Sequence, residues 1–223
     1  MKLTYFHSKR AARHAVLVAS LVICGASHAD VTYSGRAFAV NLKLVNPSPN
    51  VLTFSDTGDL PPQGGSLSAT LLTALVGTAT LSSHTLTAST SGVGGVATSS
   101  ASQQNLSAFT GQPAQVTASV VRSDTRADCG GVQGSSVVTN LTFGGSSVTV
   151  TGQPNQTISI PSVATLIINE QVVSGTGTGI TVNALHLFVG TGEELVLSSA
   201  HSDVECFVSV RPETWGGIKS LYR

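Results

Sequence analysis

A two-residue alternation of apolar and polar side chains recurs along most of this chain and constrains its fold more than any other feature. Residues 38–44, 137–143 and 180–189 carry it most clearly. A period of two places every second side chain on one face of a β-strand. Turns rich in glycine or proline separate such segments at intervals of about 8–15 residues. The sequence therefore predicts an all-β fold, an antiparallel β-sandwich or a closed β-roll, with at most one short helix.

Residues 66–76 are the segment where a helix competes with a strand. Ser66 can cap a helix, Gly77 can end it, and the leucines between them fall on one helical face. A helix of about ten residues needs tertiary packing to hold it, and a buried strand explains the same leucines. Both alternatives stay open. The next segment, residues 78–112, is rich in Thr, Ser, Ala and Gly, which predicts either a flat, weakly packed strand pair or a loop.

The clearest predicted hairpin joins residues 180–189 to residues 194–206 through a turn at residues 190–193. This turn would place His186 opposite Leu197 and His201 opposite Val182. Alternation predicts one face formed by residues 180, 182, 184, 186 and 188. Because residues on both faces near the turn are apolar, we expect this hairpin to lie centrally, between two layers.

The first 29 residues have the pattern of a secretory leader. Basic residues precede an apolar core at residues 15–26, and Ser27-His28-Ala29 offers the small side chains of a leader peptidase site. We expect cleavage after Ala29 and a secreted or periplasmic protein. Lipidation at Cys24 is an alternative, which Ile23 disfavours. The expected parts are a signal peptide at 1–29, a single β-domain at 30–206 and a C-terminal tail at 207–223.

Cleavage would change the charge balance of the chain. The mature part would keep seven basic and eleven acidic residues, a net charge of about −4. Nucleic-acid binding requires clustered Lys and Arg, so no nucleic-acid partner is predicted. Docking on anionic lipid is disfavoured for the same reason. The apolar core of the leader is shorter than the roughly 20 residues that span a bilayer, so no membrane span is predicted.

Two cysteines, Cys129 and Cys206, remain after cleavage. An even number in an exported chain predicts one disulfide. It would close a loop of about 77 residues, which the chain-entropy account equates with a stabilisation on the order of 4 kcal/mol. Two free thiols, or half of a metal site, are the alternative.

The sequence resembles the choice-of-anchor P family, most strongly over residues 150–206. The resemblance rests on ITVNALHL at 180–187, SAHSDVEC at 199–206, GQPNQTI at 152–158 and INEQ at 168–171, with a weaker match at 34–40. It implies a secreted or surface-displayed bacterial β-domain of no known activity. Because neither an apolar helix nor a sortase motif follows Cys206, a freely secreted protein is favoured over an anchored one. The signature positions are Asn169, Glu170, Asn183, Ala184, Leu185, His186, Ala200 and His201.

No group of residues predicts catalysis, a metal or a cofactor. His201-Ser202-Asp203 has the residue types of a nucleophilic triad, but adjacent strand residues alternate in direction. His186 and His201 would lie roughly 13 Å apart along the ladder, too far for one Zn²⁺. Residues 56–59 hold two carboxylates without the further oxygen ligands of a calcium loop. Glu193-Glu194 borders a turn, where solvation is expected rather than a glycosidase pair.

These observations favour an exported, non-enzymatic structural or adhesive protein of the cell surface or extracellular matrix. Such a protein would self-associate or bind a surface partner. The first alternative is a glycan- or small-ligand-binding module, in which Trp215 would stack on a sugar. An enzyme of unrecognised type is the second alternative.

Overall fold

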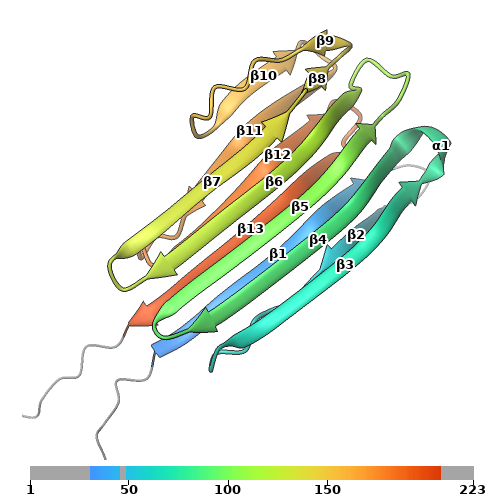
Figure 1. Cartoon of the computed structure of the whole chain (residues 1–223). Helices are drawn as coiled ribbons and strands as arrows, with labels where there is room; N and C mark the ends of the chain where they lie inside the picture. The colour runs from blue at the N-terminus through green and yellow to red at the C-terminus, as the bar shows by residue number, and fades with distance from the viewer. Residues whose placement is uncertain (1–30, 46–48, 207–223) are drawn as a thin grey trace, which may run out of the picture.

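The computed structural model describes residues 31–45 and 49–206, and these form two antiparallel sheets packed against each other (Figure 1). This confirms the predicted all-β sandwich. The proposed leader and the tail lie outside the described residues. Sheet A, in spatial order, contains β10 (Gln156–Ile160), β11 (Ala164–Val173), β12 (Gly179–Val189), β13 (Glu194–Cys206), β1 (Val31–Leu44) and β2 (Asn50–Asp56). Sheet B contains β3 (Gly65–Val76), β4 (Leu81–Val93), β5 (Val96–Ala108), β6 (Val116–Asp128), β8 (Thr142–Phe143) and β9 (Ser146–Ser147), and β7 (Gly131–Thr139) also pairs with β6.

One line of irregular residues crosses sheet A at the same level in five neighbouring strands. Ladder pairing skips one position in each of four successive strand pairs there. Three of the residues have a positive φ, which is uncommon outside glycine and interrupts an extended strand. We call this line the kink row; from β2 to β11 it consists of Ser55, Ala39, Ser198, Ala184 and Asn169.

The kink row switches the phase of side-chain alternation. Two consecutive residues are buried in β1 (Ala39 and Val40) and in β12 (Ala184 and Leu185). A regular strand would turn one of each pair to the outside. In β1 and in β12, the two residues that flank the buried pair are three positions apart, and both of their side chains lie on the outer face of the sheet.

Two serines of the kink row connect the sheets. The hydroxyl of Ser55 donates to the backbone oxygen of Ala69 in β3 at 3.0 Å, and the hydroxyl of Ser198 donates to that of Val121 in β6 at 2.9 Å. Buried hydroxyls need such partners, because an unpaired polar group in the core costs free energy. The row is thus held by hydrogen bonds across the sandwich.

The interior differs in character along the strands. The large cluster of Leu, Val and Phe side chains lies toward the α1 end, whereas small Ala clusters and buried hydroxyls fill the end near Cys206. In this polar part, Ser202 and Thr125 share a hydrogen bond of 2.8 Å between the sheets, and the hydroxyl of Ser99 donates to the backbone oxygen of His201. Small side chains allow this close approach of the two backbones.

Residues 66–76 are neither the helix nor the buried strand that we predicted. They form β3, an edge strand of sheet B in which only Ala74 is buried. The leucine pattern arises because β3 also shifts its alternation, so Leu72 and Leu75 are both exposed. A single helical turn, α1, follows at Gly77–Thr80 and is the one helix within the described residues. Residues 81–108 form the β4–β5 hairpin, as in the first of the two alternatives.

The final hairpin has a register one residue away from the expected one. His186 pairs with Val196 and His201 with Thr181. The predicted face was also wrong, because the kink row turns the side chain of His186 to the outer face of the sheet, where neighbouring side chains bury it, while Val182 and Leu185 point into the core. The consecutive apolar residues therefore reflect a phase switch rather than a position between two layers. Among the described residues, no helix is long and apolar enough to cross a membrane.

Candidate functional site on sheet A

The outer face of sheet A holds a chain of polar contacts at the kink row. Glu170 pairs with Asn183 in the β11–β12 ladder, and His186 lies on the other side of the kink in β12. Because alternation switches at Ala184, Asn183 and His186 face the same side although they are three residues apart. The sequence thus brings three of the predicted signature residues, Glu170, Asn183 and His186, into one cluster.

The carboxylate of Glu170 is shared by its two neighbours. Its Oε2 accepts a hydrogen bond from Nδ2 of Asn183 at 2.6 Å and lies 2.7 Å from Nδ1 of His186. Nε2 of His186 lies 3.0 Å from Oε1 of Glu194 in β13, and the other oxygen of Glu194 is 3.6 Å from Nζ of Lys43 in β1. The contacts run without a break across four strands.

Partial burial makes this cluster favour the charged imidazolium. Burial of the ring opposes its charge, but the hydrogen bonds and negative charges of Glu170 and Glu194 outweigh burial and raise the pKa of His186 above its ordinary value. The hydrogen bond from His186 lowers the pKa of Glu170, which its own burial would raise. A doubly protonated ring can donate to both carboxylates, whereas a neutral ring has one donor only.

This cluster can hold neighbouring strands together through charged hydrogen bonds, because His186 lies between the carboxylates of Glu170 and Glu194. Both ring nitrogens of His186 face carboxylates, so neither is free to take a proton from a substrate. The side chain of Phe188 lies beside the ring, with the two ring centroids 4.1 Å apart, and is 40% exposed. Across residues 31–45 and 49–206, no three His, Cys, Asp or Glu side chains are arranged to hold a metal ion.

The other signature residues have separate roles. Asn169 has a positive φ, and its amide donates to the backbone oxygen of Gly152. Nδ1 of His201 lies 3.0 Å from the hydroxyl of Thr181, away from the His186 cluster. Ser202 points into the core, so His201-Ser202-Asp203 does not converge. The remaining signature residues, Ala184, Leu185 and Ala200, are buried core residues.

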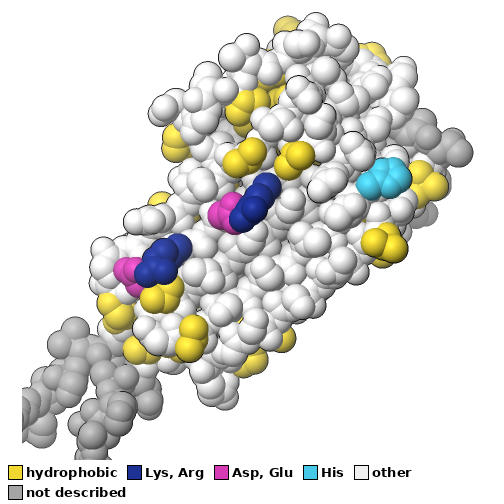
Figure 2. Space-filling model, viewed as in Figure 1, with side chains coloured by type: hydrophobic (Ala, Val, Ile, Leu, Met, Phe, Trp, Pro, Cys, Tyr) yellow, Lys and Arg dark blue, Asp and Glu magenta, His cyan; other side chains and the backbone are white. Residues whose placement is uncertain are grey.

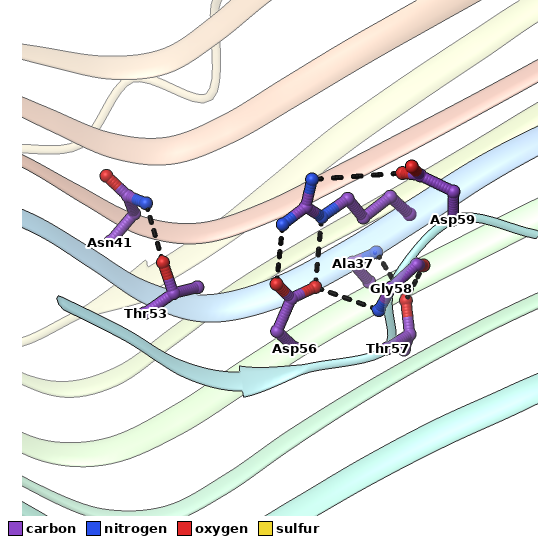
Figure 3. A network of polar contacts seen from close by, with 8 residues as sticks. Ala37, Asn41, Thr53, Asp56, Thr57, Gly58 and Asp59 are labelled. Atoms are coloured by element: carbon purple, nitrogen blue, oxygen red, sulfur yellow. Dashed lines mark hydrogen bonds and ion pairs between the residues drawn. The ribbon is translucent and has the colours of Figure 1, made fainter. Parts of the chain in front are cut away.

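A second polar cluster lies where β2 ends. Nε and an Nη atom of Arg36 donate to the carboxylate of Asp56 at 3.0 and 2.6 Å, and Asp56 also accepts from the backbone amide of Gly58 at 3.0 Å. Figure 3 shows this carboxylate beside Gly58, with Asp59 on the far side of the same network. The hydrogen bond from Arg36 lowers the pKa of Asp56. The two carboxylates considered for a calcium loop are thus both directed at a guanidinium.

A disulfide joins Cys129 to Cys206, with 5.8 Å between the two Cα atoms. Cys129 belongs to the β6–β7 turn of sheet B, and Cys206 ends β13 of sheet A. The bond therefore links the two sheets at the polar end of the sandwich. This is the pairing expected from the sequence.

Sequence reasoning missed two members of the main cluster, Glu194 and Lys43. Glu194 had been interpreted as a solvated turn residue, but it begins β13 and contacts His186. In the sequence, the phase switch is indicated by two pairs of adjacent apolar residues inside otherwise alternating strands, Ala39-Val40 and Ala184-Leu185. Trp215, the predicted ligand contact, lies outside the described residues.

No family model, curated protein or solved structure matches this chain. The resemblance to the choice-of-anchor P family therefore stays an expectation from the sequence.

Proposed function

We propose that this chain is an exported, non-enzymatic structural or adhesive protein of the cell surface or extracellular matrix. The observation that carries the proposal is the outer face of sheet B. There, three neighbouring strands present Ser and Thr side chains in register, for example Ser68 opposite Ser89 and Ser89 opposite Ser100. We call this surface the hydroxyl face; it consists of Ser66, Ser68, Thr70, Thr87, Ser89, Ser91, Thr98, Ser100 and Ser102, none of which is buried.

The hydroxyl face suits contact with an extended partner. Short hydroxyl side chains lose little rotamer freedom on binding and both donate and accept hydrogen bonds. They also avoid the large cost of removing charges from water. Figure 2 shows this side of the molecule as a mostly uncharged surface, on which the charged groups form two patches. β6, which pairs with β5 in this sheet, carries Arg122 and Arg126, each paired with an aspartate two residues later.

Export is supported by the predicted leader and by the disulfide, since such bonds persist in oxidising compartments. The cleavage after Ala29 is part of the proposal. The intact mass of the native protein tests it: the expected value is that of residues 30–223 less about two hydrogens. A mass that includes residues 1–29, or two free thiols, would contradict export in this form.

Imaging of the native protein in place tests the structural role. We expect it in fibres or layers around the cell, and we expect Ser89→Glu to reduce its retention there, because that change puts a charge in the centre of the hydroxyl face. Thr157→Glu, on an exposed position of sheet A, is the matched control and should be retained like the native protein. A native protein that is diffuse in the medium would contradict the proposal.

A further inference from the structure

The edge of sheet B formed by β3 is long and uncharged. β3 has 12 residues, Gly65–Val76, and none of them is Asp, Glu, Lys, Arg or Pro. Two of its leucines are among the most exposed apolar side chains described, Leu72 at 78% and Leu75 at 63%. Edge strands present unpaired backbone groups and usually carry features that prevent pairing with another chain.

Both edge strands of sheet A carry such features. β2 has seven residues, follows Pro49 and ends at the charged Asp56. β10 has five residues and is followed directly by Pro161. Short strands, charges and prolines all oppose edge-to-edge pairing. On the other side of sheet B, β7 also lacks charge and proline, but it has nine residues and its Gly134 oxygen accepts a hydrogen bond from Nε2 of Gln171. β3 is the longest of these edge strands and carries the most exposed leucines.

The orientation of the β3 backbone follows from the register of β4. The two-residue turn at Gly94-Gly95 closes on the hydrogen-bonded pair Val93–Val96, so the backbone groups of the alternate residues, down to Ala88, face β3. Ala69 pairs with Ala88 and therefore bonds to β4, and the hydroxyl of Ser55 reaches both the oxygen of Ala69 and that of Leu86. The N–H groups of the alternate residues Ser66, Ser68 and Thr70 therefore face the open edge. Among the described residues, no backbone group of another strand bonds to that edge.

We infer that β3 is the strand through which two copies of this chain join, antiparallel, so that their B sheets form one continuous sheet across a two-fold axis. The inference deepens the proposed function and rests on it for its biological meaning. The backbone edge requires a β-strand as its partner. A second copy fits because two uncharged strands meet without repulsion between like charges, and a two-fold axis near Leu72 gathers the exposed leucines of both copies at one seam.

The proposed contact is isologous and therefore closes at two copies. With the axis near Leu72, Thr70 of one copy would lie opposite Ala74 of the other, so the two hydroxyl faces would lie on either side of the leucine seam within one continuous sheet. Larger assemblies would need a second surface. A dimer, rather than a filament, is thus the expected product of this contact alone.

Sedimentation of the full chain over a range of concentrations tests the inference. We expect dimers for the native protein. For the double variant Leu72→Lys, Leu75→Lys we expect weaker dimerisation, with a dissociation constant at least tenfold larger. Val172→Lys, Val173→Lys in β11 changes two exposed valines in the other sheet and should leave the dimer intact. Ser68→Pro removes an outward N–H without touching the β3–β4 hydrogen bonds, and it should also weaken the dimer. Thermal unfolding of each variant checks that it is folded.

The possible outcomes separate this inference from the proposed function. A native protein that stays monomeric, or dimers that persist in both β3 variants, would overturn the inference. In the second case fibres or layers around the cell would leave the structural role standing on other contacts. Dimers that are lost only in the β3 variants, together with a native protein diffuse in the medium, would keep the inference and overturn the structural role.

Discussion

Oε2 of Glu170 lies 2.7 Å from Nδ1 of His186, although the two residues belong to different strands and 16 positions separate them. The contact depends on the kink row. With regular alternation, His186 and Asn183 would point to opposite faces of β12, and Glu170 could not meet both. A local break in strand geometry therefore creates the polar cluster on sheet A.

The stability contributed by His186 should depend on pH. Folding raises the pKa of His186, so the charged ring stabilises the folded state. This contribution is complete below the unfolded value of about 6.5 and is lost as the pH rises through the folded value. The groups that face the ring are Glu170 from β11 and Glu194 from β13, with Lys43 behind Glu194.

Urea unfolding of the native protein and of His186→Gln at several pH values checks this dependence. The native protein should exceed the variant in free energy of unfolding by more at pH 6 than at pH 8.5. Gln104→Asn, at an exposed position of β5, changes no ionisable group and is the control, so its difference from the native protein should not depend on pH. An advantage of the native protein that grows with pH would contradict the assignment.

Loss of the disulfide should strongly destabilise the protein. The double variant Cys129→Ser, Cys206→Ser releases a constraint on 77 residues of chain, and the expected loss in free energy of unfolding is about 2–5 kcal/mol. Thermal unfolding with and without a reductant measures it. The reductant should lower the melting temperature of the native protein and leave that of the variant unchanged.

Gly35→Ala should destabilise the sandwich by about 1–3 kcal/mol, because a Cβ at this position would lie 2.3 Å from Oγ1 of Thr90 in the opposite sheet. Adding Thr90→Ala should recover part of the loss. Gly175→Ala is the matched control, since a Cβ there meets no atom within 4 Å. Equal effects of the two glycine changes on chemical denaturation would show that the close approach at Gly35 is unimportant.

Thr85→Gly should stabilise the protein by about 1 kcal/mol, the reverse of the usual effect of glycine in a strand. Thr85 has a φ of 48°, a conformation that is strained for a β-branched residue and accessible to glycine. Ser89→Gly, four residues later in a regular part of β4, should instead destabilise it. The midpoints of urea unfolding of the two variants should shift in opposite directions.

The fold class and the disulfide could be predicted from the sequence, because both depend on local patterns or on simple counting. Alternation in residues 38–44 and 137–143 marks strands whatever their neighbours are. Once the predicted leader is set aside, the two cysteines that remain leave one simple pairing.

The polar cluster was harder to predict, because it depends on register between strands. The turn at residues 190–193 predicts Leu197 as the partner of His186, but the observed partner is Val196, one residue away. Unbroken alternation also predicts the wrong face of β12 for His186. Ser198 and Asn169 adopt left-handed conformations within strands, which single-sequence propensities do not report. The edge position of β3 likewise follows from the order of strands in the sheet.

The first and last strands of the described fold end side by side, since Val31 pairs with Cys206 (Figure 1). The chain thus enters and leaves at one pole of the sandwich, and the disulfide fastens that pole across both sheets. Tension applied through Val31 and Cys206 would separate β1 from β13 beginning at this terminal pair. The disulfide to Cys129 would keep the end of β13 attached to sheet B. The opposite pole, with α1 and the β5–β6 turn, would carry none of that load.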